Sequence, residues 1–173
     1  FFVMKHPTSS TTMYLYHCAG RYVYKYPITS TGIGTLIETH DLGAANFIYG
    51  TPAVFNGRAY VPRATATGFS PTLTTWEELT TVANGAGDTW TTGAANRQAR
   101  GFHVWDKPEG SLLVLFNGNT IRTASAISAP PVDGDWSGTF AAGDGSYGIN
   151  ALETHKPNLL VVGLQDGWGT FDE

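Results

Sequence analysis

The chain has 173 residues, of which 42% are hydrophobic, so it is long and apolar enough for one domain with a core and does not have a disordered composition. Its formal net charge is −4 and its ten Lys and Arg residues are scattered, which argues against nucleic acid as a partner. No run of about 18 apolar residues occurs, so no membrane span is expected. The single Cys18 cannot form an internal disulfide.

Four hairpins are predicted along the chain, because the abundant Gly, Thr and aromatic residues favour β-strands joined by tight turns. In residues 13–26, two β-branched and aromatic runs surround a turn at 18–20. In residues 53–62, apolar runs flank Asn56-Gly57, the strongest short signal for a hairpin turn. Residues 102–116 and 149–162 predict the third and fourth hairpins. Residues 75–82 favour a strand with alternating faces over a short helix.

An internal repeat with a spacing of 47 residues links the last two hairpins. Residues 101–115 and 148–162 both run from a glycine through a large apolar residue and an acid (Asp106, Glu153) to a turn and Leu-Leu-Val. A fixed period in the forties indicates stacked supersecondary units. We therefore expect a single β-repeat domain with units at about 1–45, 46–85, 86–131 and 132–173.

The repeat and its turns resemble the β-propeller group, and one turn is similar to the Asp box of sialidase-like propellers, Ser-x-Asp-x-Gly-x-Thr-Trp. Gly87, Thr89 and Trp90 match that motif, whereas Ala83 and Gly85 replace its Ser and Asp. The resemblance implies an all-β fold of propeller-like, four-stranded antiparallel units, as a partial propeller from a longer chain. The alternative is a β-sandwich, in which the 47-residue match would be a coincidence.

A candidate calcium loop lies at residues 133–144. Asp133, Asp135, Ser137 and Asp144 occupy the first, third, fifth and twelfth positions of the twelve-residue calcium-loop pattern, and Gly138 occupies the sixth. Alternate residues of a tight loop can direct their oxygens to one point, as calcium requires. The alternative is a turn whose Asp side chains bind their own backbone. No cofactor other than Ca²⁺ is expected.

Glycoside hydrolysis needs two carboxylates facing each other, and Glu77, Glu78, Asp106, Glu109 and Glu153 are candidates by residue type alone. The sialidase resemblance also implies an arginine cluster, a tyrosine nucleophile and an assisting acid. The six arginines and eight tyrosines lie in no recognisable family motif, so none is assigned such a role.

Recognition by aromatic side chains is the remaining functional class. Trp90 and Trp136 are expected to pack between strands, whereas Trp76, Trp105 and Trp168 are the candidate ligand-binding residues. The sequence thus predicts a non-catalytic binding or structural module of an extracellular or virion-surface assembly, such as a tail fibre. Its expected partners are glycan or other protein chains. The alternative is a fragment of a glycan-cleaving, sialidase-like propeller enzyme.

Overall fold

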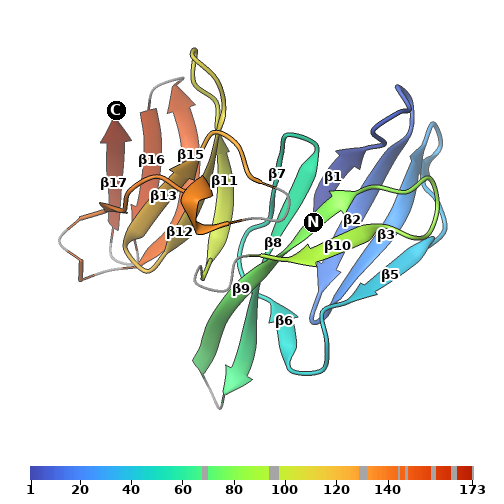
Figure 1. The fold of residues 1–173 in the computed structure, drawn as a ribbon, viewed down its shortest axis with the longest axis horizontal. Helices are drawn as coiled ribbons and strands as arrows, with labels where there is room; N and C mark the ends of the chain where they lie inside the picture. The colour runs from blue at the N-terminus through green and yellow to red at the C-terminus, as the bar shows by residue number, and fades with distance from the viewer. Residues whose placement is uncertain are drawn as a thin grey trace.

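The fold is all-β, as predicted, and consists of four antiparallel sheets that follow one another along the chain (Figure 1). This computed structural model describes residues 1–67, 70–93, 98–128, 132–143, 145–146, 148–156, 159–164 and 167–172, with 66–67, 70–71 and 167–172 as backbone only. Within these ranges no sheet closes on itself. None of the described segments forms a helix long and apolar enough to cross a membrane.

Each sheet is built from strands that are close in sequence. The first sheet contains β1 (Phe2–Lys5), β2 (Met13–Ala19), β3 (Tyr22–Thr29), β4 (Gly32–Ile33) and β5 (Glu38–Asp41). The second contains β6 (Asn46–Ile48), β7 (Ala53–Phe55), β8 (Arg58–Thr67), β9 (Ser70–Thr81) and β10 (Thr89–Thr92). The third contains β11 (Gly101–Trp105), β12 (Leu112–Asn117), β13 (Thr120–Ala124) and β14 (Phe140–Ala141). The fourth contains β15 (Ile149–Lys156), β16 (Leu159–Leu164) and β17 (Gly167–Asp172).

The four predicted hairpins are confirmed as the pairs β2–β3, β7–β8, β11–β12 and β15–β16. The β7–β8 turn has the predicted chemistry, since Asn56 and Gly57 both adopt positive φ, at 49° and 77°. Two positive φ angles give the turn the twist of the flanking strands, and Asn-Gly reaches them at low cost. Residues 75–82 are predicted as a strand, and β9 confirms this through Thr81.

The 47-residue repeat is also a repeat of structure in the third and fourth sheets. Strands β12 and β16 begin at Leu112 and Leu159, and strands β13 and β17 begin at Thr120 and Gly167, both 47 residues apart. The first strands differ, because β11 ends at Trp105 whereas β15 continues with two register shifts to Lys156. The third sheet therefore has a six-residue loop at 106–111, between β11 and β12.

The extent of each sheet differs at two places from the expected unit boundaries. Strand β10, expected within the third unit, pairs with β9 of the second sheet. Strand β14, expected within the fourth unit, pairs with β13 of the third sheet. In both cases the strand pairs with the strand that precedes it along the chain, across connections of 7 residues for β10 and 15 residues for β14.

Consecutive sheets follow one another in the fold (Figure 1). Three hydrophobic clusters fill the spaces between their faces. Between the first and second sheets lie Phe2, Met4, Tyr14, Tyr16, Val23, Ala59, Val61, Leu79 and Val82. Between the second and third lie Ala53, Phe55, Tyr60, Trp76, Ala99, Phe102, Leu113, Leu115, Ala124 and Trp136. Between the third and fourth lie Trp105, Val114, Phe116, Ile121, Ile149, Leu152, Leu160 and Val162.

The packing explains why β12 is a continuous apolar run. Leu113 and Leu115 face the second sheet, whereas Val114 and Phe116 face the fourth, so both faces of the strand are buried. Alternating apolar and polar residues would expose one face to water, and a continuous run is what a strand between two sheets requires.

Candidate functional site

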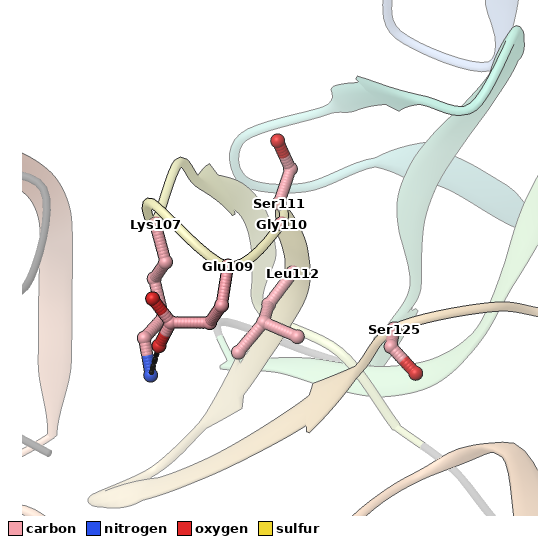
Figure 2. Close-up of a pocket in the computed structure, with 6 residues that line it drawn as sticks. All are labelled: Lys107, Glu109, Gly110, Ser111, Leu112 and Ser125. Atoms are coloured by element: carbon pink, nitrogen blue, oxygen red, sulfur yellow. Dashed lines mark ion pairs between the residues drawn. The ribbon is translucent and has the colours of Figure 1, made fainter.

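A cavity of about 410 Å³ opens beside the β11–β12 loop, where the third sheet differs from the fourth. Figure 2 shows the six residues that line it, five from residues 107–112 and one directly after β13. They are Lys107, Glu109, Gly110, Ser111, Leu112 and Ser125. The lining combines two hydroxyls, one ion pair and one aliphatic side chain, a mixture suited to a small polar ligand.

Lys107 is the main charged group of the cavity. Its side chain is only 10% exposed, and its ammonium lies 4.9 Å from the ring centroid of the buried Trp105. Its Nζ also lies 3.0 Å from a carboxylate oxygen of Glu109 (Figure 2). A cation held over an indole ring and shielded from water attracts anions more strongly than one in bulk water.

Glu109 is the exposed half of this ion pair, since its side chain is 64% exposed in the loop. The hydrogen bond from Lys107 lowers the pKa of Glu109, so its carboxylate is charged at neutral pH. Next to it, Gly110 adopts a φ of 135°, which a residue with a side chain rarely reaches. Ser111 donates a 2.5 Å hydrogen bond to Asp106, which ties the loop to the end of β11.

The cavity was missed by sequence reasoning, although its loop lies inside the repeat. One signal in the sequence is the stretch Lys107-Pro108-Glu109-Gly110. Its proline and glycine indicate a loop longer than the two residues of a tight hairpin turn. A long loop in one of two equivalent hairpins is a candidate for function, because loops carry binding residues on a rigid scaffold.

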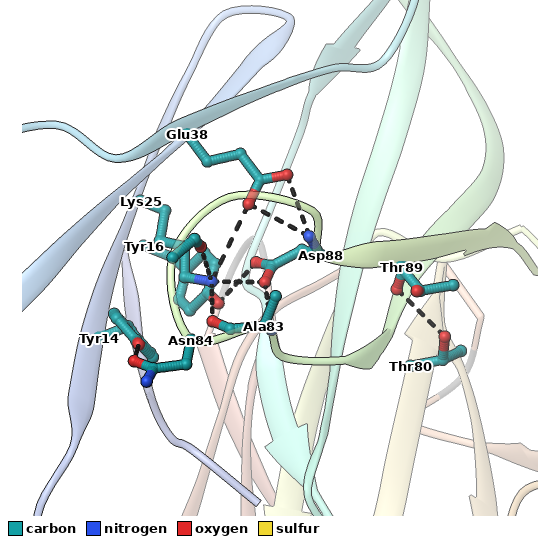
Figure 3. Close-up of polar contacts among 10 residues, drawn as sticks. Tyr14, Tyr16, Lys25, Glu38, Thr80, Ala83, Asn84, Asp88 and Thr89 are labelled. Carbon is teal, nitrogen blue, oxygen red and sulfur yellow. Dashed lines mark hydrogen bonds and ion pairs between the residues drawn. The ribbon is translucent and has the colours of Figure 1, made fainter.

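A second polar cluster surrounds the ammonium of Lys25, between the first sheet and the β9–β10 loop (Figure 3). The Lys25 side chain is 1% exposed, and Nζ donates to the carbonyls of Ala83 at 2.7 Å and Gly85 at 2.9 Å and to Asp88 at 2.5 Å. Nζ also lies 4.3 Å from the ring centroid of Tyr14. Ala83 and Gly85 are the two positions that depart from the Asp box, so here backbone carbonyls and a lysine organise the turn.

Asp88 completes this cluster from the other side. Its carboxylate accepts from the Tyr16 hydroxyl at 2.7 Å and from the Ala83 amide at 2.8 Å, and its own amide donates to Glu38 (Figure 3). Burial and the bond to Asp88 raise the pKa of Tyr16, so the phenol stays protonated. These hydrogen bonds hold the β9–β10 loop on the first sheet, which is a structural role.

The other two sheet interfaces carry polar links of their own. Arg58 of β8 donates to Glu78 at 2.9 Å and to the carbonyls of Ile127 and Ser128, which belong to the segment after β13. Between the third and fourth sheets, His103 Nε2 and Thr154 Oγ1 are 2.9 Å apart. Because a buried polar group needs a partner, these links favour one alignment of neighbouring sheets.

Of the candidate ligand-binding tryptophans, Trp76 and Trp105 are not among the described residues that line the cavity. Trp76 and Trp105 are both 0% exposed and pack between sheets, Trp105 directly beneath Lys107. Trp168 lies on β17, and its side chain is outside the described residues. Trp136 is 7% exposed in the hydrophobic cluster between the second and third sheets, consistent with its expected packing role.

The candidate calcium loop forms a short 3₁₀ turn at Asp133–Asp135. Asp135 accepts hydrogen bonds from the Val132 amide at 2.8 Å and from the amide and hydroxyl of Ser128 at 3.0 and 2.6 Å. Ser137 Oγ bonds to the backbone and hydroxyl of Thr123. Asp144 lies outside the described residues. Within the described ranges, no three His, Cys, Asp or Glu residues are placed to hold a metal ion.

Two of the candidate catalytic carboxylates, Glu77 and Glu78, do not face each other. Glu77 and Glu78 are neighbours on β9 and so point to opposite faces, Glu77 to Arg63 and Glu78 to Arg58. Burial raises the pKa of both carboxyl groups, and their arginines oppose that effect.

The likeness to known proteins is limited to the fold. No protein-family model and no curated protein matches the sequence. Among solved structures, the chain is similar to a protein of unknown function from Bacteroides caccae, with a TM-score of 0.51 and 12% sequence identity. The similarity covers 93% of this chain and 53% of that one, so the chain spans about half the length of this structural neighbour.

Proposed function

We propose that the chain is a non-catalytic recognition module made of propeller-like stacked sheets, and that the cavity beside the β11–β12 loop binds a glycan bearing a carboxylate group. The observation that carries the proposal is the pairing of Lys107, 10% exposed, with Glu109, 64% exposed, at the wall of the cavity. Glu109 occupies the place of the ligand's carboxylate and can swing outward when a ligand replaces it. Lys107 stays in place because Trp105 and the loop backbone surround it.

The remaining lining groups match the other parts of a sugar. The hydroxyls of Ser111 and Ser125 can exchange hydrogen bonds with sugar hydroxyls, and Leu112 offers an apolar wall to the C–H groups of a pyranose ring. A neutral sugar would leave Lys107 paired with Glu109 and gain little from the cation. The cavity thus favours an acidic sugar such as a uronate.

The proposal assigns binding and no reaction. Hydrolysis requires a carboxyl group that holds its proton and a second carboxylate facing it across the glycosidic bond. Of the six described lining residues Glu109 alone carries a carboxylate, and its lowered pKa suits an ionised partner of Lys107 better than a proton donor. We therefore favour the binding role over the alternative of a glycan-cleaving enzyme fragment.

The propeller-like assignment and the setting of the module are part of the same proposal. Four consecutive sheets stacked face to face and a 47-residue structural repeat support a propeller-like arrangement. The low content of charged residues, 14%, supports an extracellular or virion-surface assembly as its setting.

Calorimetric titration with sodium glucuronate, with glucose as the neutral probe, tests the binding site. We expect glucuronate to bind and to weaken as salt is added, because the key contact is ionic. Lys107→Met should weaken binding at least about tenfold, since a charge-assisted contact is lost. Lys156→Met is the matched control, because Lys156 also precedes a proline at the equivalent hairpin of the fourth sheet but is exposed and is not one of the six residues that line this cavity.

The variant Glu109→Gln is expected to change the affinity for glucuronate in the opposite direction. Replacing the Glu109 carboxylate by a neutral amide removes the charge that competes with the ligand for Lys107, so glucuronate should bind several times more tightly than to the unmodified protein. Equal affinities for glucuronate and glucose, or unchanged glucuronate binding in Lys107→Met, would overturn the proposal. A weaker affinity in Glu109→Gln would show that Glu109 contacts the ligand and does not compete with it.

A further inference from the structure

An amine and a carboxyl group lie in contact inside the fold, between the first sheet and the β9–β10 loop (Figure 3). Lys25 Nζ and Asp88 Oδ1 are 2.5 Å apart, and each of the two side chains is only 1% exposed. Lys25 belongs to β3, and Asp88 lies 63 residues further along the chain. Because folding has already brought the two groups together, a reaction between them needs no further encounter and is greatly accelerated.

The surroundings fix the position of Nζ beside the carboxyl group. The carbonyls of Ala83 and Gly85 accept hydrogen bonds from Nζ at 2.7 and 2.9 Å, and the ring centroid of Tyr14 lies 4.3 Å from it. An amine in hydrogen-bond contact with Oδ1 is also close to the carbon Cγ that carries this oxygen. Its separation from Cγ is then near the roughly 3–3.5 Å from which a nucleophile attacks.

Two further side chains are placed to move a proton and to stabilise charge. Glu38 Oε2 lies 3.9 Å from Lys25 Nζ, and the Asp88 amide donates to both Glu38 carboxylate oxygens, at 3.1 and 3.2 Å. The Glu38 carboxylate can therefore accept a proton from the nitrogen. The Tyr16 hydroxyl donates to Asp88 Oδ2 at 2.7 Å, and negative charge develops on this oxygen when an amine adds to the carboxyl group.

We propose that Lys25 and Asp88 join through an amide bond between their side chains, and that Glu38 relays a proton in this reaction. One proton of the ammonium moves to Oδ1 along the 2.5 Å contact, and the resulting amine adds to Cγ. A second proton passes from the nitrogen through Glu38 to Oδ1. The bond between Cγ and Oδ1 then breaks, Oδ1 leaves as water, and Oδ2 becomes the amide oxygen. The reaction needs no other reactant, since one ammonium and one carboxylate give one amide and one water.

Burial favours this condensation, and the ion pair is its starting state. Charges buried away from water cost free energy even when they are paired, and the amide carries no charge. The one hydrogen that stays on the nitrogen can still donate to the carbonyl of Ala83 or Gly85. The bond ties the first sheet to the second, which the single Cys18 cannot do through an internal disulfide.

Mass spectrometry of the intact protein in denaturant tests the inference. The unmodified chain should be lighter than the mass calculated from its sequence by one water molecule. After digestion with trypsin, residues 22–58 and 64–97 should appear as one branched peptide, because the enzyme no longer cleaves after Lys25 once its amine is acylated. A mass equal to the calculated one overturns the inference. So does a water loss located within one linear peptide, since that is dehydration of a single residue.

The variant Glu38→Gln tests the proton relay. Its amide oxygen can still accept from the Asp88 amide but does not take up a proton, so the full calculated mass should return. Its melting temperature should fall by about 10 °C or more, because a cross-link that closes a long loop is lost. Asp41→Asn is the matched control, since Asp41 lies on the same strand, pairs with Arg21 at the surface and should leave the water loss unchanged. Water loss that persists in a folded Glu38→Gln protein, as judged by circular dichroism, overturns the role of Glu38.

Discussion

Removing the charge of Lys25 tests the claim that a buried ammonium holds the first and second sheets together. In Lys25→Met, Asp88 keeps its carboxylate at 1% exposure but loses its cation, and the carbonyls of Ala83 and Gly85 lose a donor. Breaking a buried ion pair by removing one partner costs about 3–5 kcal/mol of unfolding free energy. That is a large share of the stability of a domain of this size.

Urea unfolding followed by tryptophan fluorescence measures this loss. Arg21→Met is the control, because the Arg21–Asp41 pair is 36% and 44% exposed and such surface pairs contribute about 0–1 kcal/mol. The double variant Lys25→Met, Asp88→Asn should cost less than the two single losses added together, since it leaves no unpaired charge. A loss below about 1 kcal/mol for Lys25→Met, similar to that of a surface ion pair, would refute the reasoning.

Two further predictions concern pH and calcium. The His40 ring stacks on Trp90 with 4.3 Å between the ring centroids, and burial lowers the pKa of His40. The unfolded chain therefore binds a proton at His40 more readily than the folded chain does. The stability that neutral His40 contributes is lost as pH falls below about 6.5, the pKa of histidine in an unfolded chain. His40→Phe keeps the stacking and should flatten the slope of unfolding free energy against pH between 7 and 5; an unchanged slope would exclude His40 as its source. At the 3₁₀ turn, Asp135→Ala removes acceptors for Ser128 and Val132 and should lower the melting temperature by a few degrees. Added Ca²⁺ should leave the melting temperature of the unmodified protein unmoved, and a clear rise would instead support a calcium site that includes residues beyond this turn.

The hairpins could be predicted from the sequence because their signals are local. Asn56-Gly57 specifies its turn through backbone conformation alone, and the run from Leu112 to Phe116 is apolar because both of its faces are covered. The 47-residue spacing predicted equivalent strands, and β12 and β16 begin at equivalent positions.

The buried partners could not be predicted in this way, since they come from distant parts of the chain. Lys25 lies between two tyrosines in a strand and resembles an ordinary exposed lysine in sequence, and its partner Asp88 is 63 residues away. In the sequence, Trp76 and Trp105 look like exposed aromatic side chains, because their burial depends on a neighbouring sheet that packs over the sheet to which each belongs. Residue type indicates what a side chain can do, but only the stacking decides whether it is exposed.

The comparison of the two equivalent hairpins explains where function can arise in such a stack. Trp105 and Leu152 are 47 residues apart, and both are buried between the third and fourth sheets. Directly after these positions the two copies diverge, one into the loop that carries Lys107 and the other into the extended end of β15. Residues between sheets are constrained on two sides by packing, whereas the hairpin ends are constrained on one side and can change without disturbing the stack. The proposed binding site therefore lies in the part of the repeat that can change without disturbing the stack, and the regular strands beneath it provide rigid support.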